Sequence, residues 1–237
     1  MLRWRPWRGV VLAAVGGYLD TLGFMMLGGL FVNHVTGNIV LAASDPSRES
    51  LSEIIMFPVF FVMVVVGTAI AGAAERRRPS FGIPVALTAE ALFLGLFMVL
   101  GLLFFPSAGS SGLVAEIVVG AAGVSGMAIQ TAVTRLAGYL FPTNMVTGTM
   151  TQLGMDAAGL LFRLHLSDDE STVASRRAGE YARVVAGFAF GAALAAVVTS
   201  YFDFWAAVVP LVVIALAARR EFEGVSRSSV ATDDAIQ

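Results

Sequence analysis

Long apolar runs separated by short polar stretches organise the chain from about residue 9 to residue 218. A helix that crosses the hydrocarbon core of a bilayer needs about 20 mostly apolar residues. The run at residues 204–218 is short and would complete a crossing by tilting, or by using Arg219 and Arg220 as snorkelling ends. Six stretches qualify or nearly so: residues 9–29, 54–74, 82–105, 112–134, 181–201 and 204–218. We therefore predict an all-α, polytopic membrane helix bundle with six full spans.

Two further apolar segments, residues 30–44 and 137–162, are interrupted by polar or helix-breaking residues. The first is too short to cross as a helix and contains the run NHVTGN at 33–38. The second contains Pro142, Gly148 and Gly154. Non-helical backbone at membrane depth is tolerated only where protein covers it or a watery cavity meets it. We expect both segments to be re-entrant or broken helices, with eight full spans as the alternative.

The basic residues, all arginines, test this map, because cytoplasmic loops of membrane proteins collect Lys and Arg. With the amino terminus inside, only Arg48 of the fifteen falls outside. The fourteen on the inner side are Arg3, Arg5, Arg8, Arg76, Arg77, Arg78, Arg135, Arg163, Arg176, Arg177, Arg183, Arg219, Arg220 and Arg227. The distribution favours six spans over eight and predicts a bacterial inner-membrane protein with both termini cytoplasmic.

The two interrupted segments resemble each other. LFVNHVTGNIVLA at 30–42 aligns with FPTNMVTGTMTQL at 141–153, and the region around Asp20 aligns roughly with that around Gln130. Each half then contains three spans, and two copies of an odd-span unit must face opposite ways across the bilayer. Inverted repeats with discontinuous helices are typical of secondary transporters. We predict a single membrane domain over 1–237, with repeats at 1–106 and 107–220 and a disordered cytoplasmic tail at 221–237.

Composition narrows the function classes. The chain is 57% hydrophobic and 14% charged, with a net charge of −2, whereas soluble domains carry about 25% charged residues. There is no cysteine, which excludes disulfides, thiolate metal sites and cysteine nucleophiles. No nucleotide motif, metal-ligand cluster or basic nucleic-acid surface is evident. We expect no cofactor, no metal and no nucleic-acid partner; the expected partners are the lipid bilayer and a small solute or ion.

Short motifs in a fixed order connect the chain to a known family. They are Gly17 with Asp20; Phe31 with Thr36, Gly37 and Asn38; Gln130; and Pro142 and Thr143 with Thr147, Gly148 and Thr149. Together they resemble the YoaK-type family of bacterial multi-span membrane proteins, a domain of unknown function. The resemblance covers about residues 9–218 and implies a six-span inner-membrane protein without implying an activity. Thr131 occupies a place where the family pattern would have an Asn.

Two carboxylates lie well inside predicted spans, where each costs roughly 2.5–3.5 kcal/mol unless it is partnered or faces water. Asp20 is either a proton or cation carrier or a structural hydrogen-bond partner of a neighbouring helix. Gly16 and Gly23 share its helical face, so another backbone can approach closely there. Glu90 poses the same choice without a surrounding motif and is a secondary candidate, as is His34.

The repeated Thr-Gly elements are the stronger candidates for a ligand site. Helices that begin at such breaks carry about half a positive charge at their amino ends, which attracts an anion or a carbonyl oxygen. The alternative is a packing contact between the two breaks. The predicted substrate-binding residues are Asp20, Asn33, Thr36, Gly37 and Asn38 from the first half, and Gln130, Asn144, Thr147, Gly148 and Thr149 from the second.

Small residues at four-residue spacing mark one further helix face. Gly187, Gly191 and Ala195 predict a tight helix–helix seam, either within the chain or between two protomers of a homodimer.

An enzymatic alternative rests on Ser125 within GVSG and on the pair His34 and Asn38, which resemble features of rhomboid-type intramembrane proteases. That serine needs a general base within hydrogen-bond reach. The family places the base, a histidine, in the sixth span, and the sixth span here contains none. We therefore expect no enzymatic activity, and predict a small permease with alternating access in which Asp20 carries the coupling proton or ion. A channel-like pore and a non-transporting scaffold are the alternatives.

Overall fold

Apolar runs become helices because a helix satisfies every backbone hydrogen bond within its own segment, as lipid surroundings demand. The computed structural model describes residues 6–44, 51–105, 112–136, 146–162 and 167–234. The described residues are helical throughout apart from short connections, with no strand among them. The elements are α1 (Pro6–Met26), α2 (Val35–Ser44), α3 (Leu51–Arg77), α4 (Gly82–Phe104), α5 (Leu113–Leu136), α6 (Val146–Phe162), α7 (Asp168–Phe202), the 3₁₀ helix η1 (Asp203–Ala207) and α8 (Val208–Asp234).

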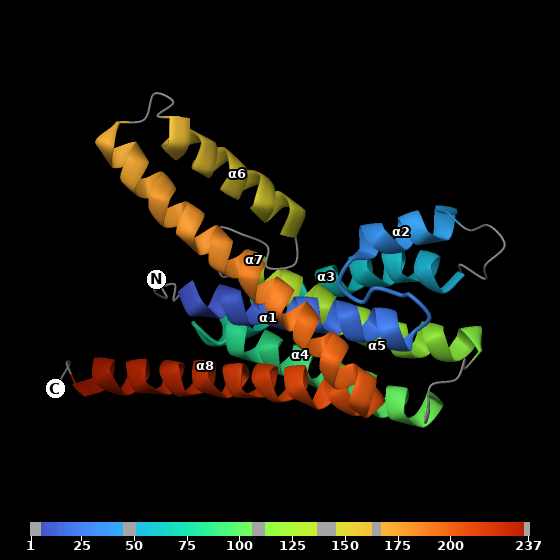
Figure 1. The fold of residues 1–237 in the computed structure, drawn as a ribbon. Coiled ribbons are helices and arrows are strands. Elements are labelled where there is room, and N and C mark those ends of the chain that lie inside the picture. Colours follow the sequence, from blue (N-terminus) through green and yellow to red (C-terminus); the bar gives the residue numbers. More distant parts are fainter. Residues whose placement is uncertain (1–5, 45–50, 106–111, 137–145, 163–166, 235–237) are drawn as a thin grey trace.

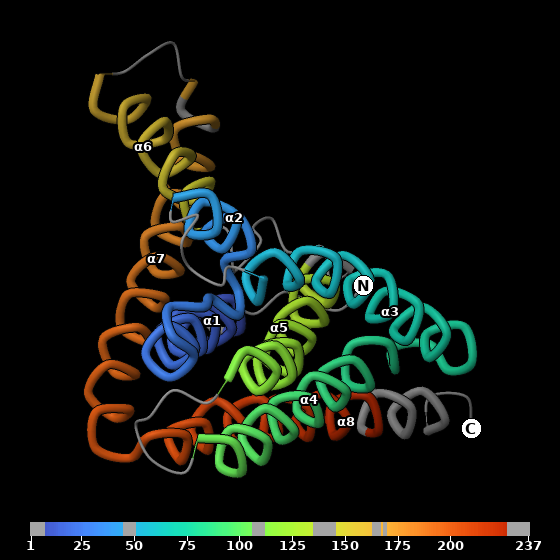
Figure 2. The backbone as a smooth tube through the Cα atoms, turned by 90° about the vertical axis from the view of Figure 1, so that its right-hand side faces the viewer, coloured from blue at the N-terminus to red at the C-terminus, as the bar shows by residue number. Residues whose placement is uncertain are grey.

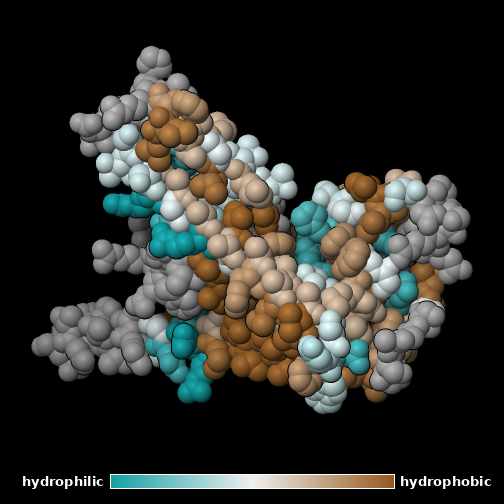
Figure 3. All heavy atoms as spheres, viewed as in Figure 1, coloured by the Kyte–Doolittle hydropathy of each residue, from teal (hydrophilic) through white to brown (hydrophobic). Residues whose placement is uncertain are grey.

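Five stretches of the described chain are long and apolar enough to cross a membrane: Arg8–Met26, Leu51–Arg77, Gly82–Phe104, Leu113–Thr134 and Glu170–Ser226. The last stretch contains both α7 and α8, joined through η1. Figure 3 shows a broad apolar surface over the middle of the bundle, with hydrophilic residues gathered towards the end where α1 begins. These features give the protein the character of a multi-pass membrane helix bundle.

The core lies where α5 packs between α3 and α4, with α1 and α7 packed together beside it and α8 against α4 (Figures 1 and 2). α2 packs on α3 and α6 packs on α7, so each short helix attaches to a long one. In Figure 1 the pair α6 and α7 extends away from the rest of the bundle on the side opposite α8.

Glycines set the spacing of the α1–α7 seam. A Cβ atom added at Gly191 would lie 1.9 Å from the carbonyl oxygen of Ala14, and one added at Gly17 would lie 2.2 Å from that of Phe188. Gly187 similarly faces the carbonyl oxygen of Val10. Of the two alternatives for the Gly187, Gly191 and Ala195 face, the structure shows the seam within the chain.

Several boundaries differ from the sequence predictions, among them the end of the first span and the C-terminal tail. The first span ends at Met26 rather than at 29, because Gly28 and Gly29 turn the chain with positive φ angles of 63° and 102°. The predicted disordered tail at 221–237 is instead helical as far as Asp234, where α8 ends. An ion pair between Arg219 and Glu223, one turn apart, supports this extension beyond the apolar part of α8.

Candidate functional site

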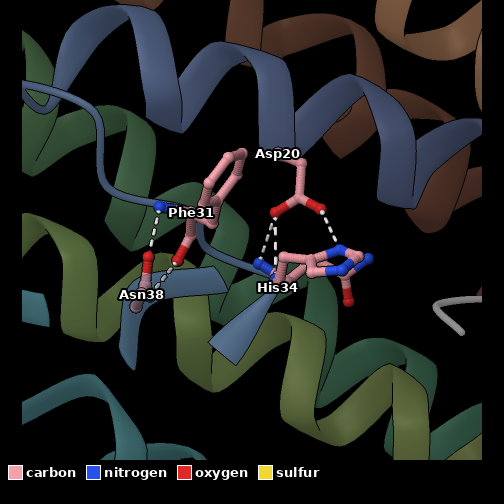
Figure 4. A network of polar contacts seen from close by, with 5 residues as sticks. Asp20, Phe31, His34 and Asn38 are labelled. Atoms are coloured by element: carbon pink, nitrogen blue, oxygen red, sulfur yellow. Dashed lines mark hydrogen bonds and ion pairs between the residues drawn. The ribbon is translucent and has the colours of Figure 1, made fainter. Parts of the chain in front are cut away.

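A non-helical loop, residues 27–34, doubles back from the end of α1 and leads into α2 (Figure 1). Asp20 of α1 holds this loop by its backbone: one carboxylate oxygen accepts the amide N–H groups of Asn33 at 2.7 Å and His34 at 3.2 Å. The other oxygen lies 3.7 Å from Nδ1 of His34, an ion-pair distance rather than a hydrogen bond (Figure 4). The Asp20 side chain is buried, and that of His34 is 39% exposed.

Asn38 fastens the same loop to α2. Its side-chain oxygen accepts the amide N–H of Phe31 at 2.8 Å, and its side-chain nitrogen donates to the Phe31 carbonyl at 2.7 Å (Figure 4). One amide side chain thus satisfies both the N–H and the C=O group of Phe31, a residue that lies outside the helices. Asn38 itself is 0% exposed, and losing its side chain would leave the N–H and C=O groups of the partly buried Phe31 without these partners.

Glycines of two helices make a slot for the returning loop. On α1, a Cβ atom at Gly16 would lie 3.0 Å from the side chain of Asn33, and one at Gly23 would lie 2.9 Å from that of Val32. On α5, Gly123 faces the same valine at 2.9 Å, and Gly120 faces Leu30 at 3.2 Å. The close approach expected on the Asp20 face of α1 is therefore present, and the chain's own loop makes it.

Sequence reasoning missed the α5 side of this slot. The three-residue spacing in GAAGVSG, residues 120–126, was the available signal, since small residues at such spacing let another segment approach a helix closely. What the sequence did not indicate is that the approaching segment is a loop rather than another helix.

The side chain of Asn33 has an unusual environment. The residue is 5% exposed, and both its side-chain oxygen and nitrogen are buried without a hydrogen-bond partner among the described residues. It lies against Gly16, close to where Met127 of α5 also contacts that glycine. A buried amide normally finds partners, so an unsatisfied one calls for an explanation.

The remaining first-half candidates take different positions. Thr36 is exposed on the first turn of α2. A Cβ atom added at Gly37 would lie 3.1 Å from the ring of Phe31 and 3.5 Å from the imidazole of His34. The missing side chain at Gly37 therefore leaves room for the rings of Phe31 and His34, whose centroids lie 6.0 Å apart.

The second-half candidates do not join this group. Gln130 is buried on α5 and donates to the carbonyl of Leu12 on α1 at 3.1 Å. On α6, Thr147 and Gly148 are exposed and Thr149 is buried, while Asn144 lies outside the described residues. Among the described residues α2 and α6 make no contact, so the two Thr-Gly segments do not form one pocket in this structure.

A separate ion pair joins α6 to α7. Nε of Arg177 donates to Asp156 at 2.7 Å, a second nitrogen of the same guanidinium contacts the other carboxylate oxygen, and Gln152 donates to Asp156 at 3.1 Å. Arg177 holds the pKa of Asp156 below its usual range. The pair borders a cavity of about 400 Å³ between the two helices. A mid-helix Asp and an Arg 21 residues away give no sequence signal of pairing.

The described residues contain no group of three or more His, Asp or Glu side chains placed to hold a metal ion. Glu90, the secondary carboxylate candidate, lies on α4 and is wholly buried.

Comparisons with known proteins agree with this picture of a multi-pass membrane protein. Over 162 residues the chain is 28% identical to a Bacillus subtilis protein named UPF0700 transmembrane protein YoaK; the alignment covers 64% of this chain and 67% of that protein. No solved structure matches. Residues 8–219 match a family described as protein of unknown function DUF1275. Since the match spans nearly all of the membrane-embedded chain, the protein belongs to this family of transmembrane proteins.

Proposed function

We propose that the protein is a small secondary transporter of a bacterial inner membrane that carries a small polar solute or ion. The observation that carries this proposal is the unpartnered amide of Asn33, buried on a non-helical loop beside Asp20 and His34. Polar groups placed at membrane depth mark substrate and ion pathways. An amide offers both a donor and an acceptor, which suits an uncharged polar group or a carboxylate of a solute.

Helix directions support an inverted repeat. α7 and α8 run in opposite directions within the fifth apolar stretch, which brings the number of proposed crossings to six (Figure 1). Matching α1 to α5, α3 to α7 and α4 to α8 pairs helices that run opposite ways in the same view. This is the relation that inverted three-span halves require.

Helix packing supports the same relation. α1 packs on α7 as α3 packs on α5, and α2 packs on α3 as α6 packs on α7. If the two halves are exchanged, the α1–α7 contact becomes the α5–α3 contact, and the α2–α3 contact becomes the α6–α7 contact. The contact between α4 and α8 remains the same. The broken segments then occupy equivalent places in the two halves, each attached to the second long helix of its repeat.

Asp20 fits the role of an anchor better than that of a proton carrier. One of its oxygens accepts two backbone N–H groups that would otherwise be unpaired, so the carboxylate is committed to holding the loop. In this proposal solute reaches Asn33 when the loop leaves its glycine slot, and Asp20 with His34 returns the loop to its place.

We propose no enzymatic activity. The hydroxyl of Ser125 donates to the carbonyl of Ala121 in its own helix at 2.6 Å, and the imidazole of His34 faces Asp20. A nucleophile needs its general base within hydrogen-bond reach, and each of these side chains is engaged elsewhere.

A non-transporting scaffold is the second candidate, favoured by the filled slot and by the lack of contact between α2 and α6 among the described residues. Counterflow in proteoliposomes separates the candidates, with labelled acetate, glycine and methylammonium as probes of the acid, zwitterion and cation classes. A carrier gives an overshoot with one probe that Asn33→Leu abolishes. A channel gives uptake without overshoot, and inertness towards all three favours the scaffold and contradicts the transport proposal.

Loop movement can be tested without a known solute, because the chain has no native cysteine. Asn33→Cys and Leu22→Cys both place a thiol at a buried position, the first on the loop and the second on α1. We expect 2-aminoethyl methanethiosulfonate to modify the Asn33→Cys variant many times faster than the Leu22→Cys variant, since only the loop opens. Equal, slow modification of both thiols would contradict loop release.

A further inference from the structure

Glu90 lies in a buried stripe of α4 in which its neighbours have apolar side chains. Ala86, Leu87, Leu94 and Phe97 form the same buried stripe of α4. Glu90 itself is 0% exposed, and both of its carboxyl oxygens are buried without a hydrogen-bond partner among the described residues. The structural hydrogen bond considered for Glu90 from the sequence is therefore not present in the described chain.

Charged groups of the elements packed against α4 do not compensate Glu90. Glu75 accepts the amide N–H groups of Ser80 and Gly82 at the start of α4, Arg219 pairs with Glu223, and Glu221 pairs with Arg8 of α1. None of these described charges forms an ion pair with Glu90. The charged residues of these elements whose side chains the structure describes are Glu53, Glu75, Arg76 and Arg77 on α3, Glu116 on α5, Asp203 on η1, and Arg219, Arg220, Glu221 and Glu223 on α8.

An ionised carboxylate buried without any partner is far more costly than a neutral carboxylic acid, so such groups hold a proton instead. The neutral acid still forgoes hydrogen bonds worth about 1–3 kcal/mol. A leucine at this position would avoid that cost and complete the apolar stripe. A carboxylic acid at this position therefore costs stability that an apolar side chain would not.

A small cavity lies one helical turn from Glu90. It measures about 20 Å³, close to the space that one water molecule needs. Leu87 and Ile83 of α4 line it together with Leu12, Val133 and Ala217, and the ion pair between Arg8 and Glu221 also borders it. The carbonyl of Leu12 also accepts the side-chain N–H of Gln130 at 3.1 Å, which places a further polar contact next to a residue that lines this space.

We propose that Glu90 is a proton-binding site, and that its proton exchanges through this cavity with the side of the membrane on which α1 begins. Release transfers the carboxyl proton to a water molecule that reaches Glu90 from the cavity, and leaves a carboxylate on Glu90. The carboxylate is stable only when water or a solute cation reaches it, so release requires the packing of α4 against α5 to loosen. As the coupling site of the proposed transporter, a role that rests on the proposed function, Glu90 rather than Asp20 carries the proton.

Infrared spectroscopy of the purified protein in lipid tests the protonation directly. We expect the carbonyl-stretch band of a protonated carboxylic acid at neutral pH, and we expect Glu90→Gln to remove it. Glu53→Gln is the matched control, since Glu53 is also buried but accepts a hydrogen bond from Ser52 at 2.9 Å. The band should persist in that variant and in Asp20→Asn. A band that survives Glu90→Gln, or is absent from the wild type, overturns the proposal.

Hydrogen–deuterium exchange of this band tests the route. Val133→Ile adds one methyl group beside the cavity, and we expect it to slow the shift of the band in heavy water while leaving the band itself in place. An unchanged exchange rate, with the cavity filled and the protein folded, overturns the route through this cavity.

Proton uptake with a pH-sensitive dye inside proteoliposomes separates this inference from the proposed function. If the wild type moves protons with one of the three solute probes and Glu90→Gln does so equally well, the coupling role is overturned while transport stands. If Glu90→Gln removes the infrared band and the wild type transports none of the probes, the proton site stands and the transport proposal fails.

Discussion

At the scale of single residues, three polar side chains around one loop have different tasks. Asp20 and Asn38 satisfy backbone groups that the loop cannot pair by itself, whereas the Asn33 amide has no partner among the described residues. Buried polar groups with partners stabilise a fold, and those without partners cost free energy. The first two residues are therefore best interpreted as anchors, and Asn33 as the member of the group that a solute can engage.

Substitutions at Asp20 distinguish anchoring from charge. Asp20→Ala removes the acceptor of two backbone N–H groups and should lower the free energy of unfolding by about 3 kcal/mol, from about 1–3 kcal/mol for each buried group left unpaired. Asp20→Asn keeps an oxygen at the same place and should cost much less. Thermal unfolding in detergent measures both. Equal losses for the two variants would contradict the anchoring role.

The Asp156–Arg177 pair should stabilise the contact of α6 with α7. Arg177 is 38% exposed on its side chain, so solvent weakens the pair, and we expect Asp156→Asn to cost about 1 kcal/mol. Because folding lowers the pKa of Asp156, the contribution is present above the unfolded pKa, about 3.9, and is lost as pH falls through the folded pKa. Hydrogen exchange of the α6 amides measures the effect. Unchanged protection in Asp156→Asn would show that apolar contacts alone hold α6.

At the scale of elements, glycines decide which helices approach closely. The carbonyl oxygens of α1 lie within van der Waals distance of α7, and the returning loop fills the space between glycines of α1 and α5. In lipid there is little hydrophobic drive between helices, so such close backbone packing supplies much of the association energy.

A methyl group at Gly191 should disrupt the α1–α7 seam. Its carbon would lie 1.9 Å from the Ala14 carbonyl oxygen, so backbone must move, and overpacking of this kind costs about 1–3 kcal/mol. Gly179→Ala on the same helix is the control, because nothing lies within 4 Å there and alanine is the better helix former. Thermal unfolding should show a loss for Gly191→Ala alone. Equal stabilities of the Gly191→Ala and Gly179→Ala variants would contradict close packing of α1 against α7 at Gly191.

At the scale of the whole molecule, the beginning of α1 and the later part of α8 lie at one side. The ion pair of Arg8 with Glu221 joins the beginning of α1 to the later part of α8, and the arginine distribution predicts that this side faces the cytoplasm. The proposed orientation follows from these two observations together.

Single cysteines in the cysteine-free chain test the orientation. Ser44 and Ser200 are exposed near the outer ends of α2 and α7, and Gly224 is exposed near the inner end of α8 with nothing within 4 Å. An impermeant maleimide applied to spheroplasts should label Ser44→Cys and Ser200→Cys, and should label Gly224→Cys only after lysis. Labelling of Gly224→Cys before lysis would reverse the orientation.

The sequence by itself determined that the protein is a helical membrane protein, where most of its long helices lie, and its family. Length and hydropathy suffice for these properties, since a bilayer requires long apolar segments with internally satisfied backbones. It also predicted that a backbone approaches the glycine face around Asp20. Only the tertiary structure decided that this backbone is the chain's own loop, that α2 and α6 lie apart among the described residues, and that Glu90 lacks a partner where Asp20 has several. Those outcomes depend on which helix faces meet in space, and neither periodicity nor composition specifies a partner for a residue more than a few turns away.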